Sequence, residues 1–310
     1  MGMKVYDLLV AWNWEFDKDF IAGVEQACRR RGVSVYRVEQ HNVEETLNDL
    51  RDGSLGFRSL YDRASDADES FLPLVDCRLK AKAFMINRHD FVEHAKDKAT
   101  MHCEFIARGI ATPFTVIISP YNKRKAVELS LSDLEKLGRP FIIKPANTTG
   151  GGIGVVLGAE TLRDVIEARQ HQKNDKYLLQ EKIEPASVDR KRAWFRVFYA
   201  FGEIIPCWWD DLTHIYHELT AGKEQLFDLT RLRPIMKKIH DTCKLDFFSS
   251  EIALTREGKL VVVDYVNEIC DMRLQTKYVD GVPDGIVQRI TNLIAGSILT
   301  VKERHRKHHG

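Results

Sequence analysis

The chain has 310 residues, a formal net charge of +1 and 44% hydrophobic residues. This length and composition can bury two or three hydrophobic cores, and no apolar run reaches the roughly 18 residues that a membrane-spanning helix needs. Acidic and basic residues are interspersed and nearly balanced, which argues against a general nucleic-acid binder or membrane-surface binder. We therefore expect a soluble, multi-domain protein whose specificity comes from a defined site.

The start of the chain and the cysteines both favour the cytoplasm. Only Lys4 precedes the first apolar run, and no small-residue cleavage pattern follows, so we identify no signal peptide. The six cysteines are scattered without a CxxC pair. This is typical of reduced, mostly buried thiols and argues against a disulfide framework or a zinc site. The expected location is cytoplasmic.

The first 96 residues alternate between two kinds of apolar pattern. Short apolar runs predict four strands, at 5–10, 33–38, 57–60 and 83–86. Helical spacing predicts helices at 17–31 and 43–51, and one long helical region at 87–108. The alternation predicts a small parallel sheet. Polar residues 62–65 follow the third strand, where open parallel sheets bind ligands, so Arg63 has either a substrate role or a place in a solvated loop.

Residues 139–156, RPFIIKPANTTGGGIGVV, combine a short apolar strand, a lysine and a glycine-dense loop. The strand is too short and too β-branched for a helix, which places Lys144 at a strand end. Glycines allow positive φ angles and bring backbone N–H groups close to an anion. The loop lacks the P-loop pattern and leads into a strand, whereas a P-loop leads into a helix. We interpret it as a flap over phosphates, with an ordinary β-hairpin turn as the alternative.

Residues 176–183 predict a strand that ends in polar residues. An exposed strand end offers a donor and an acceptor at the spacing of a base edge, beside apolar walls. The alternative is an ordinary edge strand whose charged side chains discourage aggregation.

Two later strands, at 248–254 and 260–266, are joined by a turn at 256–259 and read as a β-hairpin. In-register pairing would place Glu251 beside Asp264. Two facing carboxylates repel each other, and a divalent cation such as Mg²⁺ would relieve that repulsion.

The order and spacing of these features resemble the ATP-grasp superfamily. Residues 97–115, DKATMHCEFIARGIATPFT, resemble the segment in which an Asp-Lys pair opens a helix before the first strand of the nucleotide domain. Lys144 matches the superfamily's second phosphate lysine, and TTGGGIGVV matches its glycine flap. The resemblance implies an α/β ATP-grasp fold in three parts: an N-terminal open parallel-sheet domain (1–96), a linker helix with a central flap subdomain (97–183), and a C-terminal α+β subdomain for metal and substrate (184–310).

The resemblance also implies roles for individual residues. ATP would be bound by Lys98, Lys144, Thr149, Gly151, Gly152, Gly154, Gln180, Glu181, Ile183 and Glu184, with Asp189 as an alternative to Glu184 for the ribose. Mg²⁺, with Mn²⁺ as the alternative metal, would be held by Glu251, Asp264 and Asn267. The catalytic candidates are Arg196, on a strand where many members carry Asp-x-Arg, and Arg273.

Two departures from the family pattern bear on these roles. The usual acid-x-Asn is here Asp264-Tyr265-Val266-Asn267, so a regular strand would point Asp264 and Asn267 to opposite faces. Either a bulge or the end of the strand re-aims Asn267, or Glu268 is the ligand. In addition, Ser249 stands where several of these ligases have an arginine, which Arg196 or Arg273 would then replace.

The nucleotide and metal motifs look closest to the glutamate-ligase-like, RimK-type branch. This implies a carboxylate–amine ligase that transfers phosphate from Mg-ATP to a carboxylate, captures the acyl phosphate with an amine, and releases ADP and phosphate. The expected partners are small-molecule carboxylate and amine substrates. We expect no binding to nucleic acid or to a membrane, and a homodimer is possible. Two alternatives remain: a small-molecule kinase similar to the inositol phosphate kinases of this fold, and a catalytically idle nucleotide-binding protein.

Overall fold

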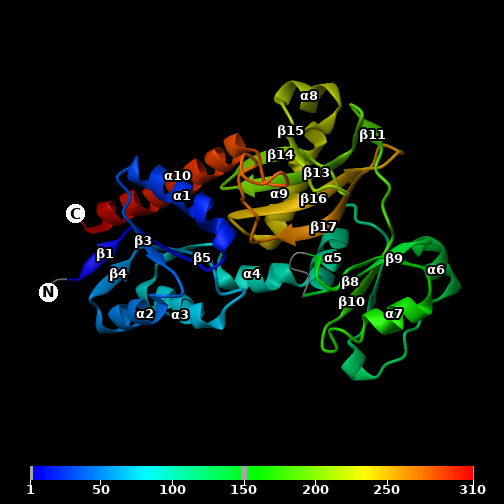
Figure 1. Ribbon diagram of the computed structural model, residues 1–310, viewed down its shortest axis with the longest axis horizontal. Helices are drawn as coiled ribbons and strands as arrows, with labels where there is room; N and C mark the ends of the chain where they lie inside the picture. Colours follow the sequence, from blue (N-terminus) through cyan, green and yellow to red (C-terminus); the bar gives the residue numbers. More distant parts are fainter. Residues whose placement is uncertain (1–2, 148–151, 310) are drawn as a thin grey trace.

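The structure is a computed structural model that describes residues 3–147 and 152–309. Its strands form three main sheets, which follow one another along the chain (Figure 1). Within the described residues, no helix is both long enough and apolar enough to cross a bilayer.

The N-terminal sheet is parallel throughout, with strand order β3-β2-β5-β6. Its strands are β2 (Leu8–Trp12), β3 (Val35–Val38), β5 (Ser59–Arg63) and β6 (Phe84–Ile86), and its helices are α1 (Lys18–Arg29), α2 (Val43–Asp52) and α3 (Pro73–Ala81). The parallel sheet predicted from the alternating pattern is confirmed. A separate parallel pair is formed by β1 (Lys4–Tyr6) and β4 (Leu55–Phe57), so the strand predicted at 57–60 is in fact two strands.

The helical region predicted at 87–108 is broken into α4 (His89–Lys96) and α5 (Lys98–Ala107). Asp97 between them has an extended backbone, and its carboxylate accepts hydrogen bonds from the N–H groups of Ala99 and Thr100. A carboxylate that caps the first N–H groups of a helix favours the start of a new helix at this point. Lys98 therefore lies in the first turn of α5.

The central sheet is antiparallel in the order β7-β10-β8-β9. Its strands are β7 (Thr115–Ile118), β8 (Phe141–Pro145), β9 (Val156–Ala159) and β10 (Tyr177–Gln180), with helices α6 (Leu131–Leu137) and α7 (Leu162–Ala168). Both helices begin with a capping box, from Ser130 and Asp133 in α6 and from Thr161 and Asp164 in α7. The glycine-dense segment thus connects two neighbouring strands, as predicted.

The C-terminal sheet is antiparallel in the order β15-β14-β13-β16-β17. Its strands are β13 (Trp194–Ala200), β14 (Glu203–Trp209), β15 (Tyr216–Glu218), β16 (Phe247–Leu254) and β17 (Leu260–Asn267). One face packs on α5 and α9 (Leu232–Cys243), and the other packs on α1 and α10 (Asp284–His309), which run side by side (Figure 1). Further short elements include α8 (Ala221–Leu226), β11 (Ser187–Val188) and β12 (Lys191–Arg192).

The outer edge of β17 is where the linker and the central sheet attach. The Val262 N–H donates to the carbonyl of Ala111 over 2.8 Å, and Lys144 Nζ donates to the carbonyl of Val263 over 3.0 Å. The backbone groups on the outer side of an edge strand need partners when they are buried. The edge of β17 is therefore covered by two segments that lie far from it in sequence. One contains Ala111 and the other contains Lys144.

Candidate functional site

The hairpin of β16 and β17 carries the paired acids, and its register contains a bulge. Glu251 lies opposite Asp264, as predicted, and Ser249 lies opposite Asn267. Two steps along β16 therefore correspond to three along β17, with an irregularity between the two pairs. Because residues two apart on a strand share a face, Asn267 returns to the face that carries Glu251 and Asp264. The extra residue is absorbed by the bulge and does not turn Asn267 away.

Arg196 is at the centre of this face. Its guanidinium is ion-paired with Glu251 and lies 3.4 Å from Ser249 Oγ. It also donates to the side-chain oxygen of Asn267 over 3.2 Å, in the amide orientation in which the Asn267 nitrogen donates to the Ile269 carbonyl. The second oxygen of Glu251 accepts a hydrogen bond from Trp194 Nε1 over 3.2 Å. Arg196 therefore reaches across Ser249, the position where the family pattern usually has an arginine.

Lys144 approaches the same acids from the central sheet. Its ammonium is 3.7 Å from Asp264 Oδ1 and 5.2 Å from the centroid of the Tyr265 ring, and the side chain is 7% exposed. Lys98, in the first turn of α5, is close enough to interact electrostatically with both Lys144 and Asp264. The two lysines that the sequence singled out, 46 positions apart, thus meet at the edge of β17.

Burial and these charges shift the pKa values of the cluster in different directions. Burial raises the pKa of Glu251, although Arg196 opposes the shift. For Asp264, burial also acts upward, but Lys98, Lys144 and Arg196 together hold its pKa below the usual range. Burial lowers the pKa of Lys144, as does Lys98, against the attraction of Asp264. The neighbouring acids therefore have unlike environments, and the surrounding cations favour the ionised form of Asp264.

The donor set fits a hard divalent cation. Glu251, Asp264 and Asn267 offer two carboxylates and an amide oxygen on one sheet face, and Mg²⁺ prefers oxygen ligands. Over residues 3–147 and 152–309, no group of three or more His, Cys, Asp or Glu side chains is arranged to hold a metal. The candidate site offers two acids and one amide, which is fewer ligands than Mg²⁺ takes in total.

We compared the chain with known proteins to identify its fold. No family model and no curated protein matches the chain, but solved structures do. A RimK-domain ATP-grasp protein from Sphaerobacter thermophilus matches with a TM-score of 0.65 at 16% identity, over 93% of this chain and 98% of that chain. D-alanine–D-alanine ligase from Bacillus anthracis, solved with ATP, matches with a TM-score of 0.63 at 13% identity, over 98% and 99%.

A third match is PsnB, an ATP-grasp ligase solved with a minimal precursor, Mg and ADP, with a TM-score of 0.64 at 12% identity over 96% of this chain and 98% of that chain. The chain has the ATP-grasp fold. The predicted fold class is therefore confirmed, with its N-terminal parallel sheet, central antiparallel sheet and C-terminal antiparallel sheet. At these identities the similarity establishes the fold alone, so the roles of side chains rest on their own geometry.

The segment after β10, residues 181–184, leads from the central sheet toward the C-terminal sheet, and we call it the hinge. Gln180 is 1% exposed, and its amide nitrogen donates to Tyr265 Oη over 3.2 Å and to Thr115 Oγ1 over 3.3 Å. Glu181 bonds to Phe114 through its backbone N–H (2.8 Å) and its carboxylate (3.1 Å). The side chains of both residues thus hold the hinge to neighbouring elements. A hollow of about 330 Å³ lies beside them, lined by Glu181, Lys182, Ile183, Glu184, Thr255, Arg256 and Glu257.

At its described end, the glycine loop has a backbone that fits both the flap and the hairpin-turn interpretation. Gly152 and Gly154 have φ angles of +79° and +77°, which other residues adopt at a cost. A side chain at Gly154 would also come within 3.3 Å of Pro145 Cγ. Two other predicted nucleotide contacts, Thr149 and Gly151, lie outside the described residues.

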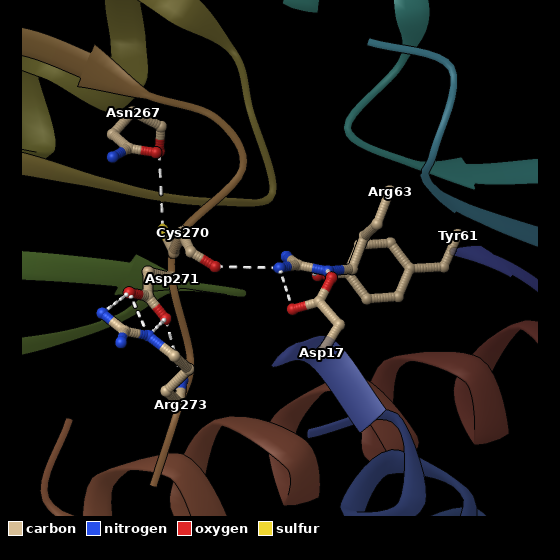
Figure 2. A network of polar contacts seen from close by, with 7 residues as sticks. All are labelled: Asp17, Tyr61, Arg63, Asn267, Cys270, Asp271 and Arg273. Atoms are coloured by element: carbon tan, nitrogen blue, oxygen red, sulfur yellow. Dashed lines mark hydrogen bonds and ion pairs between the residues drawn. The ribbon is translucent and has the colours of Figure 1, made fainter. Parts of the chain in front are cut away.

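Arg273, the second predicted catalytic cation, has other partners. It is ion-paired with Asp271 at 2.7 Å and with Asp280 at 2.9 Å, and its guanidinium lies over the rings of Phe16 and Tyr278. Figure 2 shows its side chain turned toward Asp271 on the segment after Asn267. None of the contacts described for Arg273 involves the acids of β16 and β17, so of the two predicted arginines only Arg196 contacts Ser249 in the described residues.

Arg63 is buried and is therefore not part of a solvated loop. It is the last residue of β5, is 3% exposed, and makes two hydrogen bonds of 2.7 Å with Asp17. It also donates to the carbonyl of Cys270 over 2.9 Å, while Cys270 Sγ contacts the carbonyl of Asn267 (Figure 2). A buried ion pair of the N-terminal domain thus anchors the segment that follows Asn267. The sequence carries no local signal for it, because Asp17 and Arg63 are 46 positions apart.

Proposed function

We propose that the protein is an ATP-dependent carboxylate–amine ligase that releases ADP and phosphate. The observation that carries the proposal is the meeting of Lys144 with Asp264 at 3.7 Å, at the edge where the central sheet contacts the C-terminal sheet. An ammonium beside paired carboxylates suits a metal-bound polyphosphate, because cations and a metal together offset the phosphate charge. The ATP-grasp fold, shared with ligases solved with ATP or with Mg and ADP, supports the same reading.

The nucleotide would lie between the central and C-terminal sheets. Lys98 and Lys144 would contact its phosphates, and the loop that contains Gly152 and Gly154 would close over them and exclude water. The base would lie at the hinge, bonded to the backbone of residues 181–183, with Glu184 or Asp189 near the ribose. Gln180 would act there by holding the hinge in place, since its side chain is buried against Tyr265.

Glu251, Asp264 and Asn267 would hold Mg²⁺, with Mn²⁺ as the alternative. When bound, the cation would supply charge neutralisation between the phosphate groups of ATP. Asp264 is suited to this role because Lys98 and Lys144 favour its ionised form. Glu251 would share the cation through the lone pairs that Arg196 and Trp194 do not use.

Arg196 is the group best placed to bind the acceptor carboxylate. Its Nε atom is buried and has no hydrogen-bond partner among the described residues, so one donor of the guanidinium remains unpaired. A carboxylate oxygen of the substrate would attack the γ-phosphorus of ATP, and ADP would leave. An amine would then attack the acyl carbon of the resulting acyl phosphate, and phosphate would leave with the bonding electron pair.

One observation favours a second candidate, an idle nucleotide-binding protein. Both carboxylate oxygens of Glu251 already have partners, in Arg196 and in Trp194. If Arg196 outcompetes the metal for the carboxylate of Glu251, ATP would bind without being turned over.

A single assay separates the candidates. The protein would be incubated with Mg-ATP, hydroxylamine and a panel of amino acids, small acids and polyols, while ADP, phosphate, pyrophosphate and hydroxamate are followed. The ligase predicts ADP, phosphate and a hydroxamate, all lost in Asp264→Asn. A stable phosphate ester without hydroxamate would identify a kinase, and ATP binding without turnover would identify the idle protein. Release of pyrophosphate would contradict the proposed mechanism.

A further inference from the structure

Tyr265 lies in the bulge of β17, between the proposed metal ligands Asp264 and Asn267. Its side chain is fully buried and points away from the acids, into the hydrophobic cluster that contains Phe105. Between these ligands the chain has two residues, Tyr265 and Val266, where the family pattern has one. Of the two, Tyr265 carries a ring and a hydroxyl that make specific contacts.

The hydroxyl of Tyr265 is fixed from two sides. Gln180 Nε2 lies 3.2 Å from it, and His102 Nδ1 lies 2.9 Å from it. An amide nitrogen can only donate, so the hydroxyl accepts from Gln180, and the tautomer of His102 sets the direction of the second bond. His102 is 5% exposed and Gln180 is 1% exposed, so water does not compete for these bonds. The ring is therefore held by α5 and β10 as well as by its own strand.

The ring of Tyr265 in turn faces the ammonium of Lys144, which lies 5.2 Å from the ring centroid. The same ammonium donates to the Val263 carbonyl over 3.0 Å and lies 3.7 Å from Asp264 Oδ1. An aromatic face attracts a cation without accepting one of its N–H groups in an ordinary hydrogen bond. The ring thus supports the buried ammonium while leaving a proton of Lys144 available for a phosphate oxygen.

We propose that Tyr265 is a positioning residue, which holds the ammonium of Lys144 at the phosphate site and is itself fixed by His102 and Gln180. The inference rests on the proposed function, because it assumes that Lys144 contacts the phosphates of ATP. It goes further in assigning a task to a residue of the bulge by which this chain departs from the acid-x-Asn pattern. The bulge would then do two things at once: return Asn267 to the metal face and place an aromatic ring beneath Lys144.

The test compares binding of Mg-ATP and of adenosine to the full-length protein and its variants. Tyr265→Leu removes the ring and should weaken Mg-ATP binding about tenfold, because the cation loses its aromatic partner. Binding of adenosine, which has no phosphate, should stay within about twofold. Tyr265→Phe keeps the ring and should bind Mg-ATP within about threefold of the wild type.

Phe105→Leu is the matched control, because it removes a buried ring whose centroid is 5.6 Å from that of Tyr265 and which has no described contact with Lys144. It should lower the Tm while leaving the dissociation constant of Mg-ATP unchanged. Equal weakening in Phe105→Leu and Tyr265→Leu would reduce the effect to packing and overturn the inference. Wild-type affinity in Tyr265→Leu would overturn it as well.

Lys144→Ala separates this inference from the proposed function. If Lys144→Ala weakens Mg-ATP binding and Tyr265→Leu does not, the nucleotide site stands and only the role of Tyr265 is refuted. If the wild-type protein does not bind Mg-ATP, or binds it equally well after Lys144→Ala, the proposed function and the inference fail together.

Discussion

Asn267 on β17 lies directly opposite Ser249 on β16, even though the chain has one residue more than the usual acid-x-Asn spacing. The bulge that makes this pairing possible leaves Tyr265 and Val266 buried in the same hydrophobic cluster. A strand can thus accept an extra residue without turning its polar side chains to the wrong face, provided that the inserted side chain is one the core can hold.

The Arg196–Glu251 pair predicts an effect on stability. Glu251→Gln should lower the free energy of unfolding of the ligand-free protein by about 1–3 kcal/mol, because it leaves a largely buried guanidinium without its carboxylate. Denaturant unfolding would measure the change. Glu203→Gln is the control: it breaks a half-exposed pair with Arg289 and should cost less than about 1 kcal/mol. Equal stability of Glu251→Gln and the wild type would show that the pair is not formed.

The Asp17–Arg63 pair predicts strong coupling between two buried charges. Arg63→Met leaves Asp17 buried without a cation and should destabilise the protein by about 3–5 kcal/mol. The double variant Asp17→Leu with Arg63→Met should lie closer to the wild type than Arg63→Met alone, since no charge is then left unpaired. A double-mutant cycle by denaturant unfolding tests this expectation. Additive losses would mean that the two side chains do not depend on each other.

We predict that acidification destabilises the folded protein in part through His102. Burial and the nearby Lys144 lower its pKa in the folded protein below the usual 6.5. As the pH falls through about 6.5, the unfolded chain takes up the proton first, so the contribution of His102 is complete above that pH and is lost below it. Unfolding free energies at pH 7.5 and pH 5.5 should therefore differ less in His102→Gln than in the wild type. His171→Gln, at an exposed position, should keep the wild-type difference. The same pH dependence in His102→Gln and the wild type would refute the prediction.

Local sequence patterns were sufficient to predict much of this fold. The parallel sheet followed from alternating apolar runs, and the pairing of Glu251 with Asp264 followed from two strands joined by a short turn. Both are properties of neighbouring segments, where periodicity and turn residues decide the structure. The break at Asp97 also had a local signal, because a capping carboxylate favours a helix start.

Other features depend on contacts between distant segments. Arg63 reaches the carbonyl of Cys270, 207 positions away, and its pattern in sequence was that of a polar loop. Tyr265 reads as an ordinary strand residue until α5 and β10 bring His102 and Gln180 to its hydroxyl. The helix α10 extends to His309, through a basic segment that begins at Lys302. Basic side chains near a helix C-terminus interact favourably with the helix dipole, which offers a reason for the extension.

The central claim is that Lys144 and Asp264 face the same metal-bound phosphates. Calorimetric titration of ATP into the protein, with and without Mg²⁺, tests it most directly. We predict that Mg²⁺ strengthens ATP binding to the wild type by at least about tenfold, and that this gain is lost in Asp264→Asn, where a neutral amide replaces the charged ligand. ATP affinity that is the same with and without Mg²⁺ in the wild type, or a gain from Mg²⁺ that survives in Asp264→Asn, would contradict the claim.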